Sequence, residues 1–531
     1  MSKVFTGFDR ERVKIFNPRA TPPLITLIPM APRPDNLDGK TIYIVDVNFQ
    51  FTEPFYKAAK KLLSEKYPKV NWVVKNKIGS FFDDDPELWA EIKNKGHGAI
   101  VGPGHMDTLG PAVVGWCAEL EKLGVPAVPL TCKIFPELEK RVAYLKGMPE
   151  MRLAFIPYGI IGATESECRN ILEGNDPVSG KPVIPEIIEI LTKPPSVKEI
   201  KTGTIKREEP KFLKPDTREN LQRFIIEKGW TDYLPVVLPT EEKVVEMLKA
   251  TSHKPDEIAG KMPVSGPYES LEYTVEQVAV NAVMAGVRPE YFPIVLALAS
   301  TGQTSLWSSV TSQTRMMVVN GPIREKIKMN SGIGALSPFN EANAVIGRSW
   351  TFISKNLGGI GGIPKVNYLG SFGNGLNYNN LCFAENEEGL PKYWHPFHVQ
   401  KGYKQEESTV SIFAGFEMYS GVGPSPVSMH ENIKNRLAHH FKPDAVFYRG
   451  VGFGLNTLIL VTPEAAEVLV KEGFRTKEEL SLWLAENTWE LDDKSKSKHF
   501  KLDIVVVGGT TAGFELGNLH YTTTASVDKW R

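Results

Sequence analysis

Between residues 40 and 192, short apolar runs alternate with amphipathic stretches, and this alternation restricts the fold more than any other feature of the chain. The apolar runs have the length of buried strands, and several of the stretches between them have helical spacing. Such alternation is typical of a parallel sheet with helices on both faces, which is a doubly wound α/β fold. The expected strands are Thr41–Val47, Val70–Lys75, Gly98–Gly102, Pro126–Cys132 and Arg152–Tyr158, and the expected helices include Pro54–Glu65 and Gly110–Leu123.

Polar residues follow two of these strands, at the edge where open α/β sheets bind ligands. Asp46 and Asn48 close the first strand. Asp46 has two interpretations, since it can hold a ligand hydroxyl or cap a helix terminus. We therefore count Asp46 and Asn48 as candidate substrate-binding residues.

The loop of residues 102–110 follows the third strand and is rich in glycine, which lets a backbone approach a ligand closely. His105 and Asp107 are titratable groups and thus candidate catalytic residues, and Thr108 is a candidate for substrate binding. The alternative is an ordinary strand-to-helix turn in which Asp107 or Thr108 caps the helix.

The segment after this loop, residues 116–128, resembles the UGSC family, which is named for a Gly-Ser-Cys loop that begins with selenocysteine or cysteine. The resemblance continues through Phe135-Pro136, Gly147-Met148-Pro149 and Ile156-Pro157. It extends into the second half of the chain at residues 281–291, 320–323, 342–348 and 385–388. It implies an architecture rather than a reaction.

A count without gaps places the family's four-residue loop on residues 106–109. Met106 and Leu109 then occupy the two chalcogen positions, and neither side chain forms a thiolate. The thiol or selenol chemistry of the family loop is therefore not expected here.

Two further segments separate the expected domains. Residues 1–39 are rich in proline, which disfavours helix and central strand, so we expect an extended arm that contributes contacts but no sheet hydrogen bonds. Residues 193–215 are rich in Lys and Pro and resemble a linker. The expected domains are an α/β domain over 40–192 and a larger mixed α/β domain over 216–531.

The second domain carries capping boxes that predict helix starts at Asp216 with Glu219, Ser428 with Glu431, and Thr476 with Glu479. Strand candidates interleave with the helices. They are Met316–Asn320, Thr409–Phe416, Ala445–Gly450, Thr457–Val461 and Leu502–Gly508.

The stretch from Cys382 to Ser408 combines carboxylates, histidines and aromatic residues, as a buried acid–base site requires. Glu385, Glu387 and His398 are its candidate catalytic residues. In extended chain the two glutamates face the same side and can form a coupled pair, or bind a divalent cation with His398. The alternative is that Glu387 and its neighbour Glu388 are simply solvated.

Other loops of this domain offer polar backbone or side chains to a ligand. Residues 358–362 and 370–375 are glycine-rich but lack the spacing of a nucleotide fingerprint, and flexible turns explain them equally. Arg348 suits capture of a carboxylate or a structural ion pair. The remaining candidate substrate-binding residues are Asn320, Asn374, Gly508 and Gly509.

The composition excludes several classes of function. Lys+Arg and Asp+Glu are balanced at 62 each, so no overall field attracts nucleic acid or a membrane surface. The four cysteines form no CxxC pair, which favours a reducing compartment such as the cytoplasm. We find no apolar stretch of membrane-spanning length.

These patterns predict an enzyme that performs acid–base chemistry, of a lyase or hydratase type, on a small polar or anionic molecule. His105 and Asp107 would face Glu385, Glu387 and His398 across a cleft between the domains. The cofactor is unknown, and we expect a homo-oligomer. The alternatives are a reductase or thiol-handling enzyme and a non-catalytic subunit of a larger complex.

Overall fold

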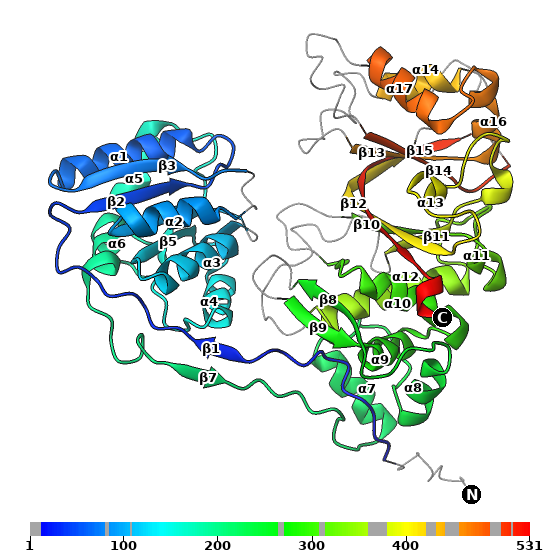
Figure 1. Cartoon of the computed structure of the whole chain (residues 1–531), viewed down its shortest axis with the longest axis horizontal. Helices are drawn as coiled ribbons and strands as arrows, with labels where there is room; N and C mark the ends of the chain where they lie inside the picture. The colour runs from blue at the N-terminus through cyan, green and yellow to red at the C-terminus, as the bar shows by residue number, and fades with distance from the viewer. Residues whose placement is uncertain are drawn as a thin grey trace, which may run out of the picture.

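The computed structural model describes residues 12–79, 84–106, 109–263, 270–306, 314–358, 380–420, 432–440, 456–488, 501–510 and 513–531. Asp107, Thr108 and Asn374 lie outside these residues, as do the expected capping box at Ser428 and the expected strand Ala445–Gly450. The chain forms two bodies that are joined by a two-stranded ribbon (Figure 1).

The N-terminal body is built on a five-stranded sheet in the order β3-β2-β4-β5-β6, and all its neighbouring strands are parallel. The strand order reverses between β2 and β4, so the doubly wound α/β class is confirmed. The strands are β2 (Thr41–Asp46), β3 (Asn71–Asn76), β4 (Gly98–Gly104), β5 (Ala127–Cys132) and β6 (Ala154–Ile156).

Helices cover both faces of this sheet because alternate strand residues point to opposite sides. Ile42 and Ile44 pack against α1, α5 and α6 on one face. Tyr43 and Val45 pack against α2, α3 and α4 on the other. The helices are α1 (Glu53–Lys66), α2 (Pro86–Lys95), α3 (Leu109–Lys122), α4 (Pro136–Leu145), α5 (Glu165–Glu173) and α6 (Val183–Thr192).

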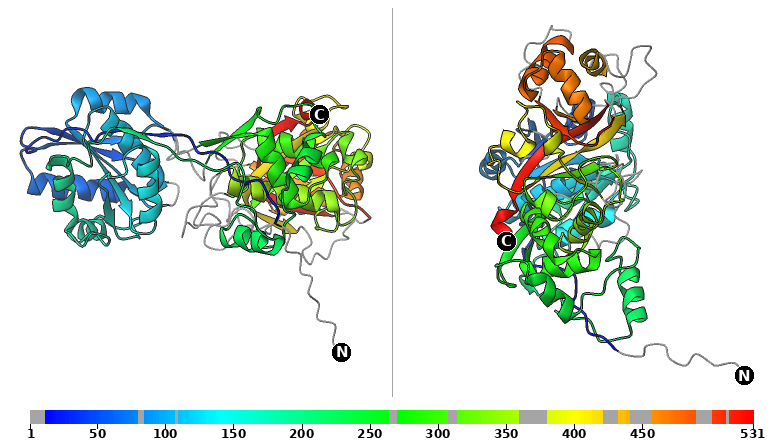
Figure 2. Two further views of the ribbon diagram at one scale, coloured as in Figure 1. Left: turned by 90° about the horizontal axis from the view of Figure 1, so that it is seen from below. Right: turned by 90° about the vertical axis from the view of Figure 1, so that its right-hand side faces the viewer.

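The proline-rich arm is integrated into the molecule, contrary to the expectation that it forms no sheet hydrogen bonds. Its strand β1 (Ile25–Leu27) pairs antiparallel with β7 (Gly203–Ile205) of the linker, and these two strands form the ribbon between the bodies (Figures 1 and 2). Ile15 and Phe16 are buried in the core of the C-terminal body. The N-terminal body is thus an insertion between two segments that pack on the C-terminal body.

The arm is also held by a buried ion pair in the N-terminal body. Arg33 donates two hydrogen bonds to the Glu121 carboxylate, at 2.6 and 2.7 Å, and both side chains are fully buried. The amides of Ala31 and Ala127 donate to the same carboxylate at 2.7 and 2.8 Å. Removal of residues 1–30 would therefore expose parts of two cores rather than detach a free arm.

The C-terminal body contains a six-stranded mixed sheet in the order β11-β10-β12-β15-β13-β14. Pairing is parallel for β10 with β11 and for β13 with β14, and antiparallel for the other pairs. The strands are β10 (Thr314–Asn320), β11 (Leu381–Ala384), β12 (Thr409–Ser420), β13 (Asn456–Val461), β14 (Lys501–Val506) and β15 (Phe514–Ser526). A separate hairpin joins β8 (Ile258–Pro263) to β9 (Ser270–Thr274).

Two groups of helices cover this sheet at its two ends (Figure 1). The first packs around α9, α10 and α12 and shares the core that holds the arm, and the second packs on β13 and β14. The first group is α7 (Arg218–Glu227), α8 (Glu241–Leu248), α9 (Val275–Ala285), α10 (Phe292–Ser300) and α12 (Glu341–Asn356). The second is α14 (Ile433–His440), α16 (Pro463–Lys471) and α17 (Lys477–Thr488), and two short helices are α11 (Ile323–Lys326) and α13 (Phe397–Gln400).

The helix starts agree with the sequence in one case and differ in another. Thr476 and Glu479 make the predicted reciprocal bonds, at 3.1 and 3.2 Å. At α7 the cap is Thr217, whose hydroxyl accepts from the Asn220 amide, so the box predicted at Asp216 is wrong by one residue. Asp216 instead accepts from the Thr217 amide at 2.8 Å.

Candidate functional site

The two loops that flank the switch point of the N-terminal sheet contact each other through aromatic rings. Phe49 follows β2, and His105 follows β4. Their ring centroids lie 4.2 Å apart in an edge-to-face arrangement. Because β2 and β4 are neighbouring parallel strands with crossovers in opposite directions, these loops flank the crevice where doubly wound sheets bind ligands.

His105 is held as a neutral imidazole with one free nitrogen. Its side chain is 1% exposed, and burial lowers its pKa to about 4. Nδ1 lies 3.3 Å from the carbonyl oxygen of Pro103, so Nδ1 carries the proton and donates it. Nε2 is then a hydrogen-bond acceptor, and among the described residues it is buried without a hydrogen-bond partner. A buried acceptor without a partner is a costly feature that a ligand donor would relieve.

Asp46 and Asn48 form a tight turn beside this histidine. Asp46 accepts a hydrogen bond from the Asn48 amide at 2.8 Å, and Asn48 has a left-handed backbone with φ 58°. The Asn48 side chain donates to the carbonyl of Gly79 at 2.5 Å. Burial raises the pKa of Asp46. Asp46 thus caps a local turn and not a helix terminus, and the side-chain amide of Asn48 joins the loops after β2 and β3.

A buried carboxyl group lies on the other side of the β4–α3 loop. Glu139 of α4 is 1% exposed, and burial raises its pKa well above the usual range, which favours the protonated form. Oε2 accepts from the Thr131 hydroxyl at 2.9 Å. Oε1 contacts the first turn of α3 so closely that a Cβ on Gly110 would lie 2.2 Å from it. A side chain at position 110 would therefore force the Glu139 carboxyl group to move.

Exposed apolar side chains surround this carboxyl edge. They occur in the loops after four of the five strands, whereas the interior of the domain is packed with apolar residues. Apolar groups exposed around a few polar ones are typical of ligand sites. These exposed residues are Phe51 after β2, Ile78 after β3, Ile134 after β5, and Tyr158 and Ile161 after β6.

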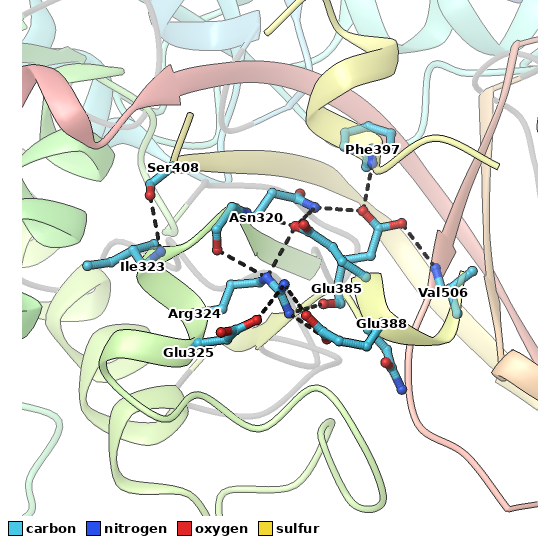
Figure 3. Close-up of polar contacts among 12 residues, drawn as sticks. Asn320, Ile323, Arg324, Glu325, Glu385, Glu388, Phe397, Ser408 and Val506 are labelled. Carbon is cyan, nitrogen blue, oxygen red and sulfur yellow. Dashed lines mark hydrogen bonds and ion pairs between the residues drawn. The ribbon is translucent and has the colours of Figure 1, made fainter. Parts of the chain in front are cut away.

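A second polar cluster lies in the C-terminal body, at the carboxyl ends of the parallel strands β10 and β11 (Figure 3). Glu385 is fully buried, and its carboxylate has four donors. They are the Asn320 side chain at 2.6 Å, the Phe397 amide at 2.6 Å, the Lys477 ammonium at 3.0 Å and the Val506 amide at 3.4 Å. All four come from the C-terminal body.

Glu387 belongs to the same cluster, because it accepts from the Asn320 side chain at 3.0 Å and the Gly321 amide at 2.7 Å. Arg324 lies 3.2 Å from Glu387 and binds Glu388 through two nitrogens at 2.7 and 3.1 Å (Figure 3). The hydrogen bonds from Arg324 lower the pKa of Glu388 to about 2. The two glutamates therefore come together as predicted, but their charges are neutralised within a network.

His398 is fully enclosed by the C-terminal body. Its side chain is 0% exposed, and neither ring nitrogen has a hydrogen-bond partner among the described residues. Its neighbour Phe397, through the backbone amide, is the residue that contacts Glu385. His398 is thus buried next to a residue of the Glu385 network, and its catalytic role stays a prediction.

Two other candidate positions, Arg348 and the Gly508–Gly509 loop, make contacts within the C-terminal body. Arg348 donates to the Asp232 carboxylate at 2.7 and 2.8 Å, which is the structural ion pair left open by the sequence. The amide of Gly508 donates to the carbonyl of Ser331 at 2.8 Å, and its own carbonyl accepts from Asn386. Both Gly508 and Gly509 have positive φ, at 78° and 158°, so this loop is a glycine turn held to its surroundings.

Comparison with protein families gives one match, since residues 14–192 match the model of the UGSC family. This part of the chain belongs to the UGSC family. No curated protein and no solved structure matches the chain. The match includes the part of the arm from residue 14 onward as well as the whole five-stranded sheet.

The structure explains how the UGSC domain accommodates the residues at its aligned loop. Leu109 is fully buried, and Met106 packs against the same core as Phe49 and Trp116. Both side chains at the chalcogen positions thus contribute to packing. The chemically capable side chain of this loop among the described residues is His105.

Glu139 of the UGSC domain was not found from the sequence, although a signal exists. Phe135, Leu138, Val142 and Ala143 form an apolar stripe with helical spacing, and Glu139 occupies a position within that stripe. A carboxyl group on the core face of a helix must be buried or neutralised. The charged, exposed neighbours Glu137 and Lys140 hide this signal, because they make the helix look polar at these positions.

Neither body shows a metal centre in the part of the chain that the structure describes, where no three potential ligands form a group. The hypothetical set of Glu385, Glu387 and His398 is not arranged as a metal site, since Lys477 already neutralises Glu385. The described helices also include none that is long and apolar enough to cross a membrane.

Proposed function

We propose that this protein is an enzyme that performs acid–base chemistry on a small polar or anionic molecule at the switch point of the UGSC domain. The observation that carries the proposal is the buried Nε2 acceptor of His105, which has no partner among the described residues and lies in a loop at the switch point. The lyase or hydratase type remains our expectation for the reaction.

The state of His105 suits a proton acceptor that becomes active when substrate binds. Burial holds the imidazole neutral at physiological pH, so Nε2 is free to accept a substrate proton. An anionic group near the ring would favour the imidazolium form and raise the pKa toward neutrality. The Nδ1 bond to Pro103 fixes the ring and its tautomer. This arrangement favours an anionic substrate with an acidic O–H or C–H bond.

The site proposed here is smaller than the one expected from sequence. Glu385 and Glu387 are left out of it because groups of their own body satisfy their carboxylates. His398 is left out because it lies in the C-terminal body and not in the loops at the switch point. A role for the C-terminal body remains part of the proposal, since the carboxyl ends of β2 and β3 lie on the side that faces this body (Figure 1).

The thiol-handling alternative has weaker support. All four cysteines are buried. Burial raises the pKa of Cys132 to about 12 and also raises the pKa of Cys117, Cys168 and Cys382. A thiol with a raised pKa forms little thiolate at neutral pH. Unpaired buried thiols agree with our expectation of a reducing compartment such as the cytoplasm, and homo-oligomerisation remains a prediction for analytical ultracentrifugation.

Proton transfer can be tested without knowledge of the natural substrate. The full-length protein is incubated in deuterium oxide with a panel of hydroxy, keto and unsaturated carboxylic acids, and proton NMR detects deuterium incorporation, hydration or dehydration. We expect a signal for wild type and its loss in His105→Gln. His253→Gln, which changes a histidine on the C-terminal body, is the matched control. Equal exchange by wild type and His105→Gln would reject the proposal.

A further inference from the structure

Three strands of the C-terminal sheet bring two basic side chains to one face, away from the Glu385 cluster. Arg315 of β10 pairs with Ala414 of β12, and Ala414 pairs with His520 of β15. Residues opposite each other in antiparallel strands point to the same side, so all three side chains share a face. The two outer Cα atoms are separated by about 10 Å, which is two strand spacings. The small Ala414 lies between the basic groups.

Arg315 differs from the other arginines that are withdrawn from solvent. Arg33 and Arg324, whose side chains are 0% and 6% exposed, each bind a carboxylate through two nitrogens. Arg315 is partly buried, and its one hydrogen bond among the described residues runs from Nε to the carbonyl of Thr304 at 3.2 Å. A guanidinium has five donors, so most of its donors are unused.

The charge on this face is also uncompensated among the described residues. Burial lowers the pKa of Arg315 to about 10. The pKa of His520 is lowered by burial and then by the positive charge of Arg315. The charge of Arg315 therefore disfavours the protonated form of His520. A buried cation without an anion is costly, and the fork of a guanidinium matches the oxygens of a carboxylate or phosphate.

We propose that Arg315 and His520 form a binding site for an oxyanion, the phosphate or carboxylate group of a small molecule, on the sheet face where Ala414 lies between them. Arg315 donates through its unused Nη groups, and His520 donates when it is protonated. The site is distinct from the crevice beside His105 and from the buried Glu385 network.

Thermal unfolding of the full-length protein tests this site, with inorganic phosphate and acetate added separately and sodium chloride used to match ionic strength. We expect one or both oxyanions to raise the melting temperature of wild type, and the one that does so identifies the group bound. Arg315→Gln should weaken the apparent affinity at least tenfold. Arg288→Gln removes the same charge from an exposed pair with Glu341 and should keep the full response.

The stability of Arg315→Gln without an oxyanion shows whether Arg315 serves binding or only holds the structure together. Because Arg315→Gln removes an uncompensated charge, we expect it to be at least as stable as wild type in oxyanion-free buffer. Titration of His520, followed by the proton NMR signal of its ring, should show a higher pKa with the anion bound. A destabilised Arg315→Gln variant, or a wild type that responds to neither phosphate nor acetate, would overturn the proposal. His105→Gln should keep the response, so this result is independent of the proposed enzyme activity.

Discussion

The two polar regions at the carboxyl ends of parallel strands differ in how their groups are satisfied. In the C-terminal body, Glu385 has four donors, including Lys477. In the UGSC domain, His105 has a buried nitrogen without a partner in the part of the chain that the structure describes. The C-terminal cluster has more charged residues, but its carboxylates already have hydrogen-bond donors. The His105 loop has fewer polar groups, but one of them can still bind a ligand donor.

Physical chemistry gives a reason for this contrast. A buried charge that is fully paired and hydrogen-bonded stabilises one arrangement of the chain, and any substrate would have to displace those partners. A neutral imidazole with an unused acceptor has no such competitor. Density of titratable residues in the sequence is thus a poorer indicator of a site than an unsatisfied group at a switch point.

The largest expected effect would test whether the Glu385 cluster is structural. Lys477→Met leaves the Glu385 carboxylate buried without its cation, and loss of one partner of a buried pair costs about 3–5 kcal/mol. Urea unfolding should show this loss in the free energy of unfolding. The exposed Lys471, changed to Met, is the control and should alter stability by less than about 0.5 kcal/mol.

The same cluster provides a check on this explanation. Glu385→Gln combined with Lys477→Met removes the uncompensated charge, so the double variant should recover part of the loss. Equal stability of Lys477→Met and the Lys471 control would show that the ion pair does not hold the cluster together.

A smaller effect is expected from pH at the crevice of the UGSC domain. His105 is neutral when folded, and its pKa falls from 6.5 to about 4 on folding, a shift of about 2.5 units or about 3 kcal/mol. The unfolded chain binds the proton more tightly, so stability decreases as pH falls from 6.5 toward 4. His105→Gln should flatten this part of the curve of unfolding free energy against pH. A variant with the wild-type slope would mean that His105 is not held neutral.

Glu139 should show the opposite pH dependence. Its pKa is raised on folding, so the folded state binds the proton more tightly and stability decreases as pH rises above the ordinary glutamate range. Glu139→Gln keeps a neutral group that can accept from Thr131, and its stability at pH 5 should stay within about 1 kcal/mol of wild type. In urea unfolding, the free energy of unfolding of Glu139→Gln should exceed that of wild type by a margin that grows between pH 5 and 9. Glu137→Gln, on the exposed face of the same helix, should not change the slope.

The sequence predicted local elements well where the pattern itself determines them. The expected strand Thr41–Val47 is observed as Thr41–Asp46, and the expected helix Gly110–Leu123 as Leu109–Lys122. Buried parallel strands are continuous apolar runs, so their signal lies in consecutive residues. The same applies to the loop that carries His105, because its place follows from the strand before it.

Local sequence patterns did not predict the contacts between residues that are far apart in the chain. The prolines of the arm indicated an extended chain, but not that Ile15 and Phe16 enter a core formed by helices more than 200 residues away. Likewise, no local pattern shows that Lys477 neutralises Glu385, since their contact depends on how α17 packs beside the sheet. The candidate site depends on such long-range contacts, so the structure altered it. The α/β class depends on local patterns, so it was predicted correctly.

The smallest expected effect concerns the thiols, and it tests acid–base against thiol chemistry within the UGSC domain itself. Cys132 ends β5, next to the Thr131 hydroxyl that donates to Glu139, so it is the cysteine nearest to the described acid. Its thiol is 2% exposed and lies 3.8 Å from the carbonyl of Pro157, and burial raises its pKa to about 12. Because the thiolate is the reactive form, native protein treated with iodoacetamide should remain unmodified at Cys132 by peptide mass spectrometry. Cys132→Ala should keep the exchange activity of wild type within a few-fold, with Cys168→Ala as the matched buried control. Loss of activity that follows modification of Cys132 alone would replace His105 with a thiol as the reactive group of this domain.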